Sequence, residues 1–159
     1  MCGGRGCKTC RMLITDPTAS VGDRRIRLTE GNCKTSNICY LAQCSICEKS
    51  YTGRTVDTLQ HRINGHRHYY KEILKKRDDD NNDVDTNSDL WMLGLHLHHD
   101  HGRADPDAFD QVIKFGILEV VSPTEIEKKE YFWMHRLNTF QPVGINIEYP
   151  FGIPFLGQK

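Results

Sequence analysis

The chain lacks long apolar runs, an excess of charge of either sign, and internal repeats. No stretch approaches the roughly 18 consecutive apolar residues of a membrane-spanning helix, and the N-terminus lacks the apolar run of a secretory signal. We therefore expect an intracellular protein without a membrane partner. Its 159 residues, with 38% hydrophobic and 26% charged side chains, predict one globular domain with appendages.

The zero net charge conceals an uneven distribution. Lysine and arginine number 21, as do aspartate and glutamate, but six of the acids and no base lie between Asp78 and Asp89. Outside that run the 21 bases exceed the remaining acids by six, and they gather within 24–27, 62–67 and 71–77. A basic surface attracts a nucleic-acid backbone. We interpret the acidic run as a solvated, disordered loop, with mimicry of nucleic-acid charge as the alternative.

Two tyrosines lie in extended segments on either side of a Cys-x-x-Cys sequence. Ile38, Tyr40 and Leu41 favour a strand near 37–43, and a second strand is expected near 49–53. A turn centred on Ser45-Ile46 would place Tyr40 opposite Tyr51, on one face of the sheet. Two phenols on one face suit a site that binds phosphate and deprotonates water. The alternative is a tyrosine pair that packs as core.

The other elements follow from hydrophobic periodicity. Leucine, isoleucine and aromatic residues at helical spacing predict a helix over about 56–76, and a short helix is expected over 90–98. The apolar run within 110–121 predicts a buried central strand. Ser122-Pro123-Thr124-Glu125 has the pattern of a capping box that opens a helix lasting to about Leu137. Residues 1–35 and the tail are expected to be irregular.

Two blocks of the sequence resemble the GIY-YIG nucleases. The first runs from Tyr40 through Tyr51-Thr52-Gly53 to Arg62 and His66, and the second comprises Glu130 to Asn138 followed by Gly144-Ile145-Asn146. The second block is similar to the phage homing-endonuclease branch, and the resemblance covers about 37–146. Ile38 and Thr52 depart from the motif's glycine and isoleucine but spare the tyrosines. The order strand, strand, helix, helix, strand, helix also matches this family, which implies an α+β fold with a small three-stranded antiparallel sheet flanked by helices.

The resemblance also implies roles for individual residues. Glu130 would hold one Mg²⁺ ion, which prefers oxygen ligands, and Arg62 would donate hydrogen bonds to the phosphoryl oxygens. His66, one helical turn further on, would position the water or a phosphate. Tyr40 or Tyr51 would be the general base, which requires a nearby cation to lower a phenol pKa of about 10. Asn146 would orient the site rather than react.

Seven cysteines in a chain without an export signal favour metal binding over disulfides. Cys44 and Cys47 have the spacing of a zinc knuckle, and the histidines of 96–101 can supply two more ligands. The residues alone do not choose among these histidines. The selection of His96 and His101 follows from resemblance to the Cys-Cys-His-His site of Penelope-like retroelement endonucleases. The alternative is a histidine-rich surface loop without metal.

The front of the chain resembles the cysteine-bearing entry to the nuclease of those elements. It carries four thiols that can bind a second Zn²⁺ ion, with unpaired reduced cysteines as the alternative: Cys2, Cys7, Cys10 and Cys33. Cys39 is expected to face away from the tyrosines and to pack as a small apolar residue. The chain thus divides into a cysteine-bearing segment (1–35), a nuclease domain (36–147) with zinc-binding insertions and the acidic loop (78–89), and an irregular tail (148–159).

The expectation is a metal-dependent DNA endonuclease similar to those of Penelope-like retroelements. Such an enzyme would nick nuclear target DNA to leave a 3′-hydroxyl for priming, with a reverse transcriptase domain of the parent element as partner. A zinc-stabilised DNA-binding module whose nuclease has decayed is the competing interpretation, and a protein-interaction scaffold is the third. The presence of Tyr40, Tyr51, Arg62 and Glu130 argues against decay, and the charge asymmetry argues against a scaffold.

Overall fold

A computed structural model describes residues 2–76 and 89–147. The expected acidic loop, except for Asp89, and the expected tail lie outside these residues. Strands β3 (Ile38–Cys44), β4 (Ser50–Thr55) and β5 (Ile113–Val120) form a three-stranded antiparallel sheet in the order β4-β3-β5. The other described elements are α1 (Lys8–Arg11), β1 (Thr18–Val21), β2 (Arg24–Arg27), α2 (Leu59–Lys76), α3 (Trp91–Leu95), a π-helix (His96–Asp100), α4 (Ala108–Val112) and α5 (Ile126–Leu137). The predicted α+β class with a small antiparallel sheet is confirmed.

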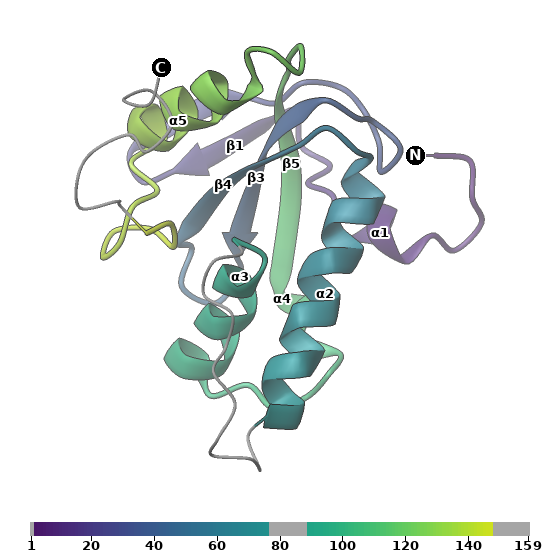
Figure 1. Ribbon diagram of the computed structural model, residues 1–159, viewed down its shortest axis with the longest axis vertical. Coiled ribbons are helices and arrows are strands. Elements are labelled where there is room, and N and C mark those ends of the chain that lie inside the picture. Colours follow the sequence, from purple (N-terminus) through teal and green to yellow (C-terminus); the bar gives the residue numbers. More distant parts are fainter. Residues whose placement is uncertain (1, 77–88, 148–159) are drawn as a thin grey trace.

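The sheet separates two apolar clusters. On one face, Tyr40 and Tyr51 pack with Leu59 and Ile63 of α2 and with Phe115 of β5. The other face buries alternate residues of the same strands beneath the β1–β2 hairpin and α5 (Figure 1). Cys39 belongs to this second cluster, so its predicted orientation away from the tyrosines is confirmed. Among the described residues, no helix has the length and apolar character needed to cross a membrane.

The register of the β3–β4 hairpin differs from the predicted one by two residues. Tyr40 pairs with Gly53, and Tyr51 pairs with Ala42. The loop contains five residues, 45–49, and Glu48 lies in the left-handed region with φ of 65°. Since side chains alternate with a period of two, the shift keeps both tyrosines on one face. They are diagonal neighbours rather than cross-strand partners, with ring centroids 6.3 Å apart.

Residues 1–35 are not irregular. Strands β1 and β2 form a hairpin whose two-residue turn is Gly22-Asp23, with Gly22 at φ of 61°. Ala19 and Val21 alternate with polar residues and are buried on the second face of the sheet. A glycine-first turn between alternating segments is a recognised hairpin signal. The signal for this hairpin was therefore present in the sequence. It was not recognised because the second strand, Arg24–Arg27, is mostly arginine.

Several predicted boundaries are also wrong. Residues 110–112 belong to helix α4, and the strand begins at Ile113. The helix predicted from residue 56 begins at Leu59, and the short helix of 90–98 continues as a π-helix to Asp100. The capping box does not form. Instead Glu125 N donates to Ser122 O at 3.0 Å, which makes a turn with Pro123 in its second position, and α5 begins at Ile126.

The outer edge of β4 is bound by Asn146. Its Oδ1 accepts a hydrogen bond from Thr52 N at 2.8 Å, and its Nδ2 donates to Thr52 O at 2.9 Å. Ile145 N donates to Ser50 O on the same edge at 2.9 Å. The side-chain amide of Asn146 therefore pairs with the strand as a neighbouring peptide group would. Thr52 lies between Tyr51 and Gly53, so Asn146 fixes the part of β4 that faces Tyr40.

Asn146→Ala should destabilise the fold. The substitution leaves the buried N–H and C=O of Thr52 without partners, at a cost of about 1–3 kcal/mol for each group. We expect the free energy of unfolding in urea to fall by about 2–4 kcal/mol. Gln111→Ala truncates an exposed amide and should change stability by less than about 0.5 kcal/mol. Equal stability of wild type and Asn146→Ala would show that water replaces these hydrogen bonds.

Candidate active site and metal centres

A hydrogen-bonded group of three side chains lies between β3 and α2. The Tyr40 hydroxyl lies 2.8 Å from His66 Nε2, and Arg62 Nε donates to the same hydroxyl oxygen at 3.3 Å. Arginine can only donate, so the Tyr40 oxygen accepts from Arg62 and its own proton is available to His66 Nε2. In that arrangement the imidazole carries its proton on Nδ1, which has no hydrogen-bond partner among the described residues. Arg62 and His66 share one side of α2, as their spacing predicted.

Gly53 provides the room for this arrangement. A Cβ at Gly53 would overlap Cζ and the hydroxyl oxygen of Tyr40. The phenol of Tyr40 therefore crosses over the backbone of its cross-strand partner and brings its hydroxyl to the edge strand β4. This is the physical reason for glycine two residues after Tyr51, since only a residue without a side chain permits the crossing.

Burial dominates the electrostatics of these groups. Tyr40, Tyr51 and His66 are at most 1% exposed. Burial raises the pKa of Tyr40 to about 12 against the opposing effect of Arg62, and it also raises the pKa of Tyr51. Burial, with a smaller contribution from Arg62, lowers the pKa of His66 to about 3. The expected lowering of a tyrosine pKa is therefore not present in the free protein, and all three groups are neutral.

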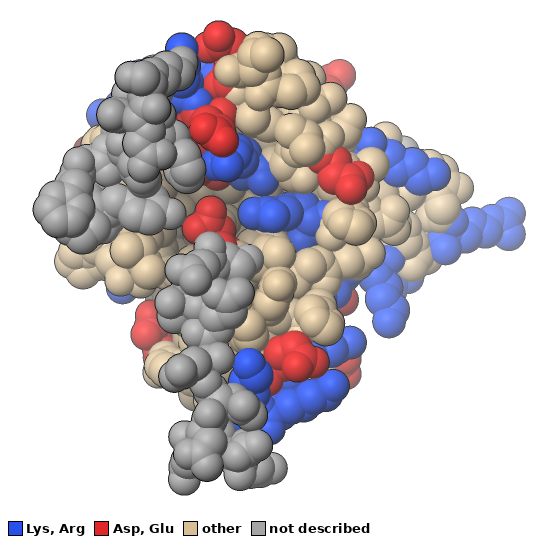
Figure 2. All heavy atoms as spheres, in the orientation of Figure 1, with Lys and Arg blue, Asp and Glu red and all other residues tan. Residues whose placement is uncertain are grey.

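Glu130 approaches from the opposite face of the sheet. Helix α5 packs on β4, and Glu130 Oε1 accepts a hydrogen bond from Arg54 Nη1 at 2.9 Å. Burial raises the pKa of Glu130 to about 7, although Arg54 acts in the opposite direction. The charge of Glu130 also raises the pKa values of Tyr40 and Tyr51, so the two halves of the site interact across β4. In the view of Figure 2, basic side chains lie in the middle of the visible side of the molecule with acidic ones around them.

The structure thus brings together most of the predicted catalytic residues. Tyr40, Tyr51, Arg62 and His66 form one group, and Glu130 is electrostatically coupled to it. Asn146 binds the outer edge of β4, which agrees with an orienting role. His66 is fully buried and its Nε2 faces the Tyr40 hydroxyl, so any effect on the water or a phosphate would act through Tyr40, and the predicted role stays a prediction.

Sequence reasoning missed two residues of this site. Arg54, which directly follows Tyr51-Thr52-Gly53, binds Glu130. Hydrophobic periodicity does not indicate such a polar contact. Asp89 was assigned to the acidic loop, yet its charge raises the pKa values of Tyr40, Tyr51 and Glu130. Neither the Arg54–Glu130 contact nor the electrostatic effect of Asp89 is readable from local sequence, because each joins residues far apart in the chain.

The first candidate metal centre lies at the β3–β4 loop. Sγ of Cys44 lies 3.4 Å from Nε2 of His101, and Sγ of Cys47 lies 3.3 Å from Nε2 of His96. The two Nε2 atoms are 3.2 Å apart. Zn–S and Zn–N bonds of about 2.3 and 2.0 Å at tetrahedral angles imply S···N and N···N separations of about 3.5 and 3.3 Å. The four ligand atoms therefore have the spacing of a zinc site, and they include the two predicted histidines.

A π-helix explains how two histidines five residues apart meet. In an α-helix, residues i and i+5 lie about 140° apart around the axis, whereas the wider turn of a π-helix brings them to one side. The π-helix begins at His96 and ends just before His101. His98 and His99, which were the alternatives, lie outside the four-ligand group, and His98 Nδ1 contacts Arg103 O at 3.2 Å instead.

Asp100 is a further member of this centre that the sequence analysis did not identify. Its Oδ2 lies 2.8 Å from Nδ1 of His96. An aspartate there keeps the imidazole proton on Nδ1 and leaves Nε2 as the ligand atom, as carboxylates behind zinc-binding histidines do. The His-x-x-x-Asp spacing within a helix was the signal that could have indicated the pair.

The second candidate centre contains the four N-terminal thiols. Their ligand atoms lie within 4.8 Å of one another, and they belong to Cys2, Cys7, Cys10 and Cys33. Sγ of Cys7 and Sγ of Cys33 are 3.8 Å apart, which matches the edge of a tetrahedral zinc–thiolate site. Cys33 O also accepts a hydrogen bond from Gln60 N, in the first turn of α2. A metal at these thiols would therefore hold the start of the helix that carries Arg62.

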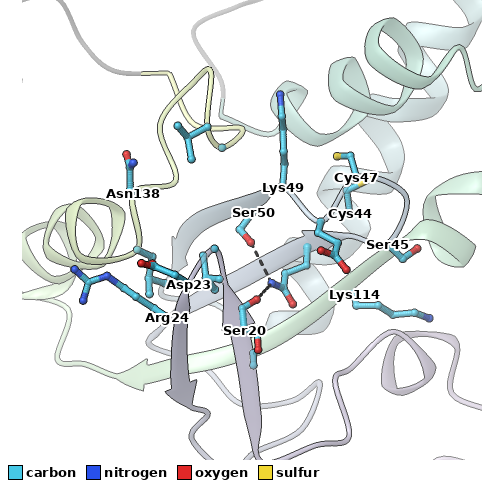
Figure 3. A pocket seen from close by; sticks show the side chains of 18 of the residues that line it. Ser20, Asp23, Arg24, Cys44, Ser45, Cys47, Lys49, Ser50, Lys114 and Asn138 are labelled. Carbon is cyan, nitrogen blue, oxygen red and sulfur yellow. Dashed lines mark hydrogen bonds between the residues drawn. The ribbon is translucent and has the colours of Figure 1, made fainter.

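A separate cleft of about 730 Å³ lies between the β1–β2 turn, the β3–β4 loop and the end of α5 (Figure 3). Its basic side chains, Arg24, Lys49 and Lys114, extend in different directions. Gln43 Nε2 donates to Ser20 O at 2.7 Å and to Ser50 Oγ at 3.1 Å. These contacts join the hairpin to the sheet, and none of the predicted catalytic residues lines the cleft.

Comparison of the chain with models of known protein families, with curated proteins and with solved structures finds no match.

Asp100→Asn should weaken zinc binding about 10- to 100-fold, because asparagine no longer holds the His96 proton as a carboxylate does. Competition with a coloured zinc chelator measures the affinity. Asp107→Asn removes an exposed charge nearby and serves as the control. Wild-type zinc affinity in Asp100→Asn would contradict the orienting role of Asp100.

Cys47→Ser should lower zinc content and melting temperature together, because metal binding contributes to folding.

The buried neutral His66 predicts a pH dependence of stability. The ring has a pKa near 6.5 when unfolded and about 3 when folded. Between these values the unfolded state binds more protons, so the stability from the neutral ring is complete above about pH 6.5 and is lost toward pH 3. We expect the free energy of unfolding to fall with decreasing pH more steeply in wild type than in His66→Gln, by up to about 1.4 kcal/mol per unit.

Urea unfolding of both proteins at several pH values between about 4 and 6.5 measures this difference. Glutamine retains an acceptor for the Tyr40 hydroxyl, so the hydrogen bond is preserved while the titrating ring is removed. The raised pKa of Glu130 acts with the opposite sign, and it cancels because both proteins contain it. Parallel stability curves would mean that His66 titrates normally in the folded protein.

Proposed function

We propose that this protein is a DNA endonuclease of the GIY-YIG type, which hydrolyses phosphodiester bonds with Mg²⁺. The observation that carries the proposal is the crossing at β4. The Tyr40 hydroxyl, bound by Arg62 and His66, reaches the same strand that Glu130 approaches from the other side. The three-stranded antiparallel sheet and the surrounding helices support the assignment of this fold.

The residues present fit a magnesium ion. Glu130 offers one hard carboxylate, and Mg²⁺ commonly uses one or two protein carboxylates together with waters and substrate phosphate. When bound, the ion would neutralise charge on the scissile phosphate and stabilise the leaving oxygen. The cysteine and histidine clusters suit zinc instead, because thiolate and imidazole are its ligands. Catalytic and structural metals therefore have separate ligands.

Arg62 would stabilise charge on the phosphoryl oxygens during hydrolysis. Tyr40 is favoured over Tyr51 as the general base, because Arg62 donates to its oxygen and would stabilise a phenolate. His66 accepts the Tyr40 hydrogen bond and orients the hydroxyl. Tyr40 is protonated in the free protein, so to act as a base it would first have to give its proton to solvent, and a bound cation would favour that ionisation.

The resemblance to Penelope-like retroelements extends the proposal to the biological role. The enzyme would nick target DNA in the nucleus and leave a 3′-hydroxyl from which a reverse transcriptase primes. A reverse transcriptase domain of the parent element would then be its partner. The alternative is a DNA-binding module without cleavage, and complete burial of both phenols is the observation in its favour.

Plasmid nicking with and without Mg²⁺ tests the proposal. Glu130→Gln and Arg62→Ala should each reduce nicking at least about a hundredfold, because each removes a preorganised charge from the site. Tyr40→Phe should slow nicking more than Tyr51→Phe does. Glu125→Gln and Arg136→Ala change the same residue types at exposed positions and should retain activity.

Circular dichroism of each variant checks that the fold is retained. Full activity in folded Glu130→Gln would overturn the assignment of the metal ligand. A wild-type protein that binds DNA without nicking it, at any Mg²⁺ concentration, would favour the binding module.

A further inference from the structure

Arg54 connects β4 to two carboxylates on α5. It lies on the face of β4 opposite Tyr51 and Gly53, paired with Cys39. Its Nη1 donates to Glu130 Oε1 at 2.9 Å, and its Nη2 donates to Glu127 Oε1 at 3.3 Å. The guanidinium therefore bridges residues one turn apart on the helix. The side chain of Glu130 is 13% exposed and that of Glu127 is 50% exposed, so the buried contact is the one to Glu130.

Helix α5 is attached to the sheet by contacts that do not involve Arg54. Trp133 Nε1 donates to Glu119 Oε2 of β5 at 3.1 Å, and Lys129 Nζ lies 3.2 Å from Glu119 Oε1. Ile126 and Leu137 are buried in the second apolar cluster. The position of the helix is thus set by its apolar face and Glu119. What Arg54 determines is the direction of the Glu130 carboxylate, because a glutamate side chain has several rotatable bonds.

We propose that Arg54 is the positioning residue for Glu130, holding one carboxylate oxygen so that the other oxygen is fixed in place to bind the divalent cation. This rests on the proposed function in assigning the cation to Glu130. An ionised carboxylate has two oxygens with about four acceptor positions, so it binds an arginine and a metal together. Carboxylates that ligate metals are themselves hydrogen-bonded, and loss of such partners costs about 10- to 100-fold in metal affinity.

An alternative role for Arg54 is direct contact with a DNA phosphate, since guanidinium groups bind phosphate well. The two roles differ in what happens without DNA. A positioning residue changes cation affinity in the free protein, whereas a phosphate contact changes only DNA binding and cleavage. The 27% exposure of the Arg54 side chain and its engagement with two carboxylates favour the positioning role.

Binding of Mn²⁺, followed by its electron paramagnetic resonance signal without DNA, tests the proposal. The protein carries its zinc during the titration, and Glu130→Gln identifies the Mn²⁺ site that depends on Glu130. Arg54→Ala should weaken Mn²⁺ binding at that site at least tenfold, and the Mg²⁺ concentration for half-maximal nicking should rise similarly. Arg27→Ala, which removes an exposed strand arginine, should leave the Mn²⁺ affinity unchanged.

Arg54→Lys keeps the charge, but a single ammonium group cannot bridge two carboxylates in the same way. Weakened Mn²⁺ binding in folded Arg54→Lys supports the proposal even if Arg54→Ala does not fold. Unchanged Mn²⁺ affinity in either folded variant overturns it, including the case in which cleavage alone is lost. Absence of a Glu130-dependent Mn²⁺ site in wild type also overturns it.

The outcome is separable from that of the proposed function. If wild type binds Mn²⁺ through Glu130 but never nicks DNA, the nuclease assignment is overturned. The Mn²⁺ titrations of the Arg54 variants then still decide the positioning role. If wild type nicks DNA and Arg54→Ala binds Mn²⁺ as tightly as wild type, the nuclease assignment stands and the positioning role is overturned.

Discussion

The side chain of Tyr40 crosses over Gly53 to reach the edge strand β4, and the candidate site is arranged around that crossing. One face of β4 meets Tyr40, Arg62 and His66, and the other face carries Arg54, which binds Glu130. Successive side chains of a strand point to opposite faces, so β4 contributes to both sides of the sheet. The same geometry makes the site depend on the outer edge of β4, where Asn146 replaces the missing strand.

The metal centres lie at the ends of the elements that carry the site. Cys44 ends β3 and Cys47 lies in the loop that joins β3 to β4, while the carbonyl group of Cys33 accepts a hydrogen bond from the first turn of α2. A domain of this size buries a limited core, so metal–ligand bonds at these clusters would add folding free energy. In both centres, ligands distant in sequence meet at one point. Each centre would fix a hairpin or helix end that positions Tyr40 or Arg62.

The polar groups inside the site are buried in the neutral state, apart from the arginines. Burial holds Tyr40 protonated and His66 unprotonated, and it raises the pKa of Glu130 toward neutrality. Buried polar groups are costly unless they are hydrogen-bonded, and here the Tyr40 hydroxyl bonds with Arg62 Nε and His66 Nε2, whereas His66 Nδ1 has no hydrogen-bond partner among the described residues. Under the proposed function, this network is ready to respond to positive charge. A cation beside Glu130 would favour the ionised forms of both Glu130 and Tyr40.

The sequence by itself determined the main strands and helices of the α+β class, the helix that presents Arg62 and His66 on one side, and the supply of cysteines and histidines that can bind a metal. These features depend on periodicity and residue chemistry, which neighbouring residues carry. The choice of His96 and His101 came from the resemblance, and the tertiary structure groups them with Cys44 and Cys47. The tertiary structure alone decided the two-residue shift that makes Tyr40 and Tyr51 diagonal neighbours, the pairing of Arg54 with Glu130, and the burial of His66. Register depends on loop geometry and burial on packing between distant elements, and neither is encoded in a local pattern.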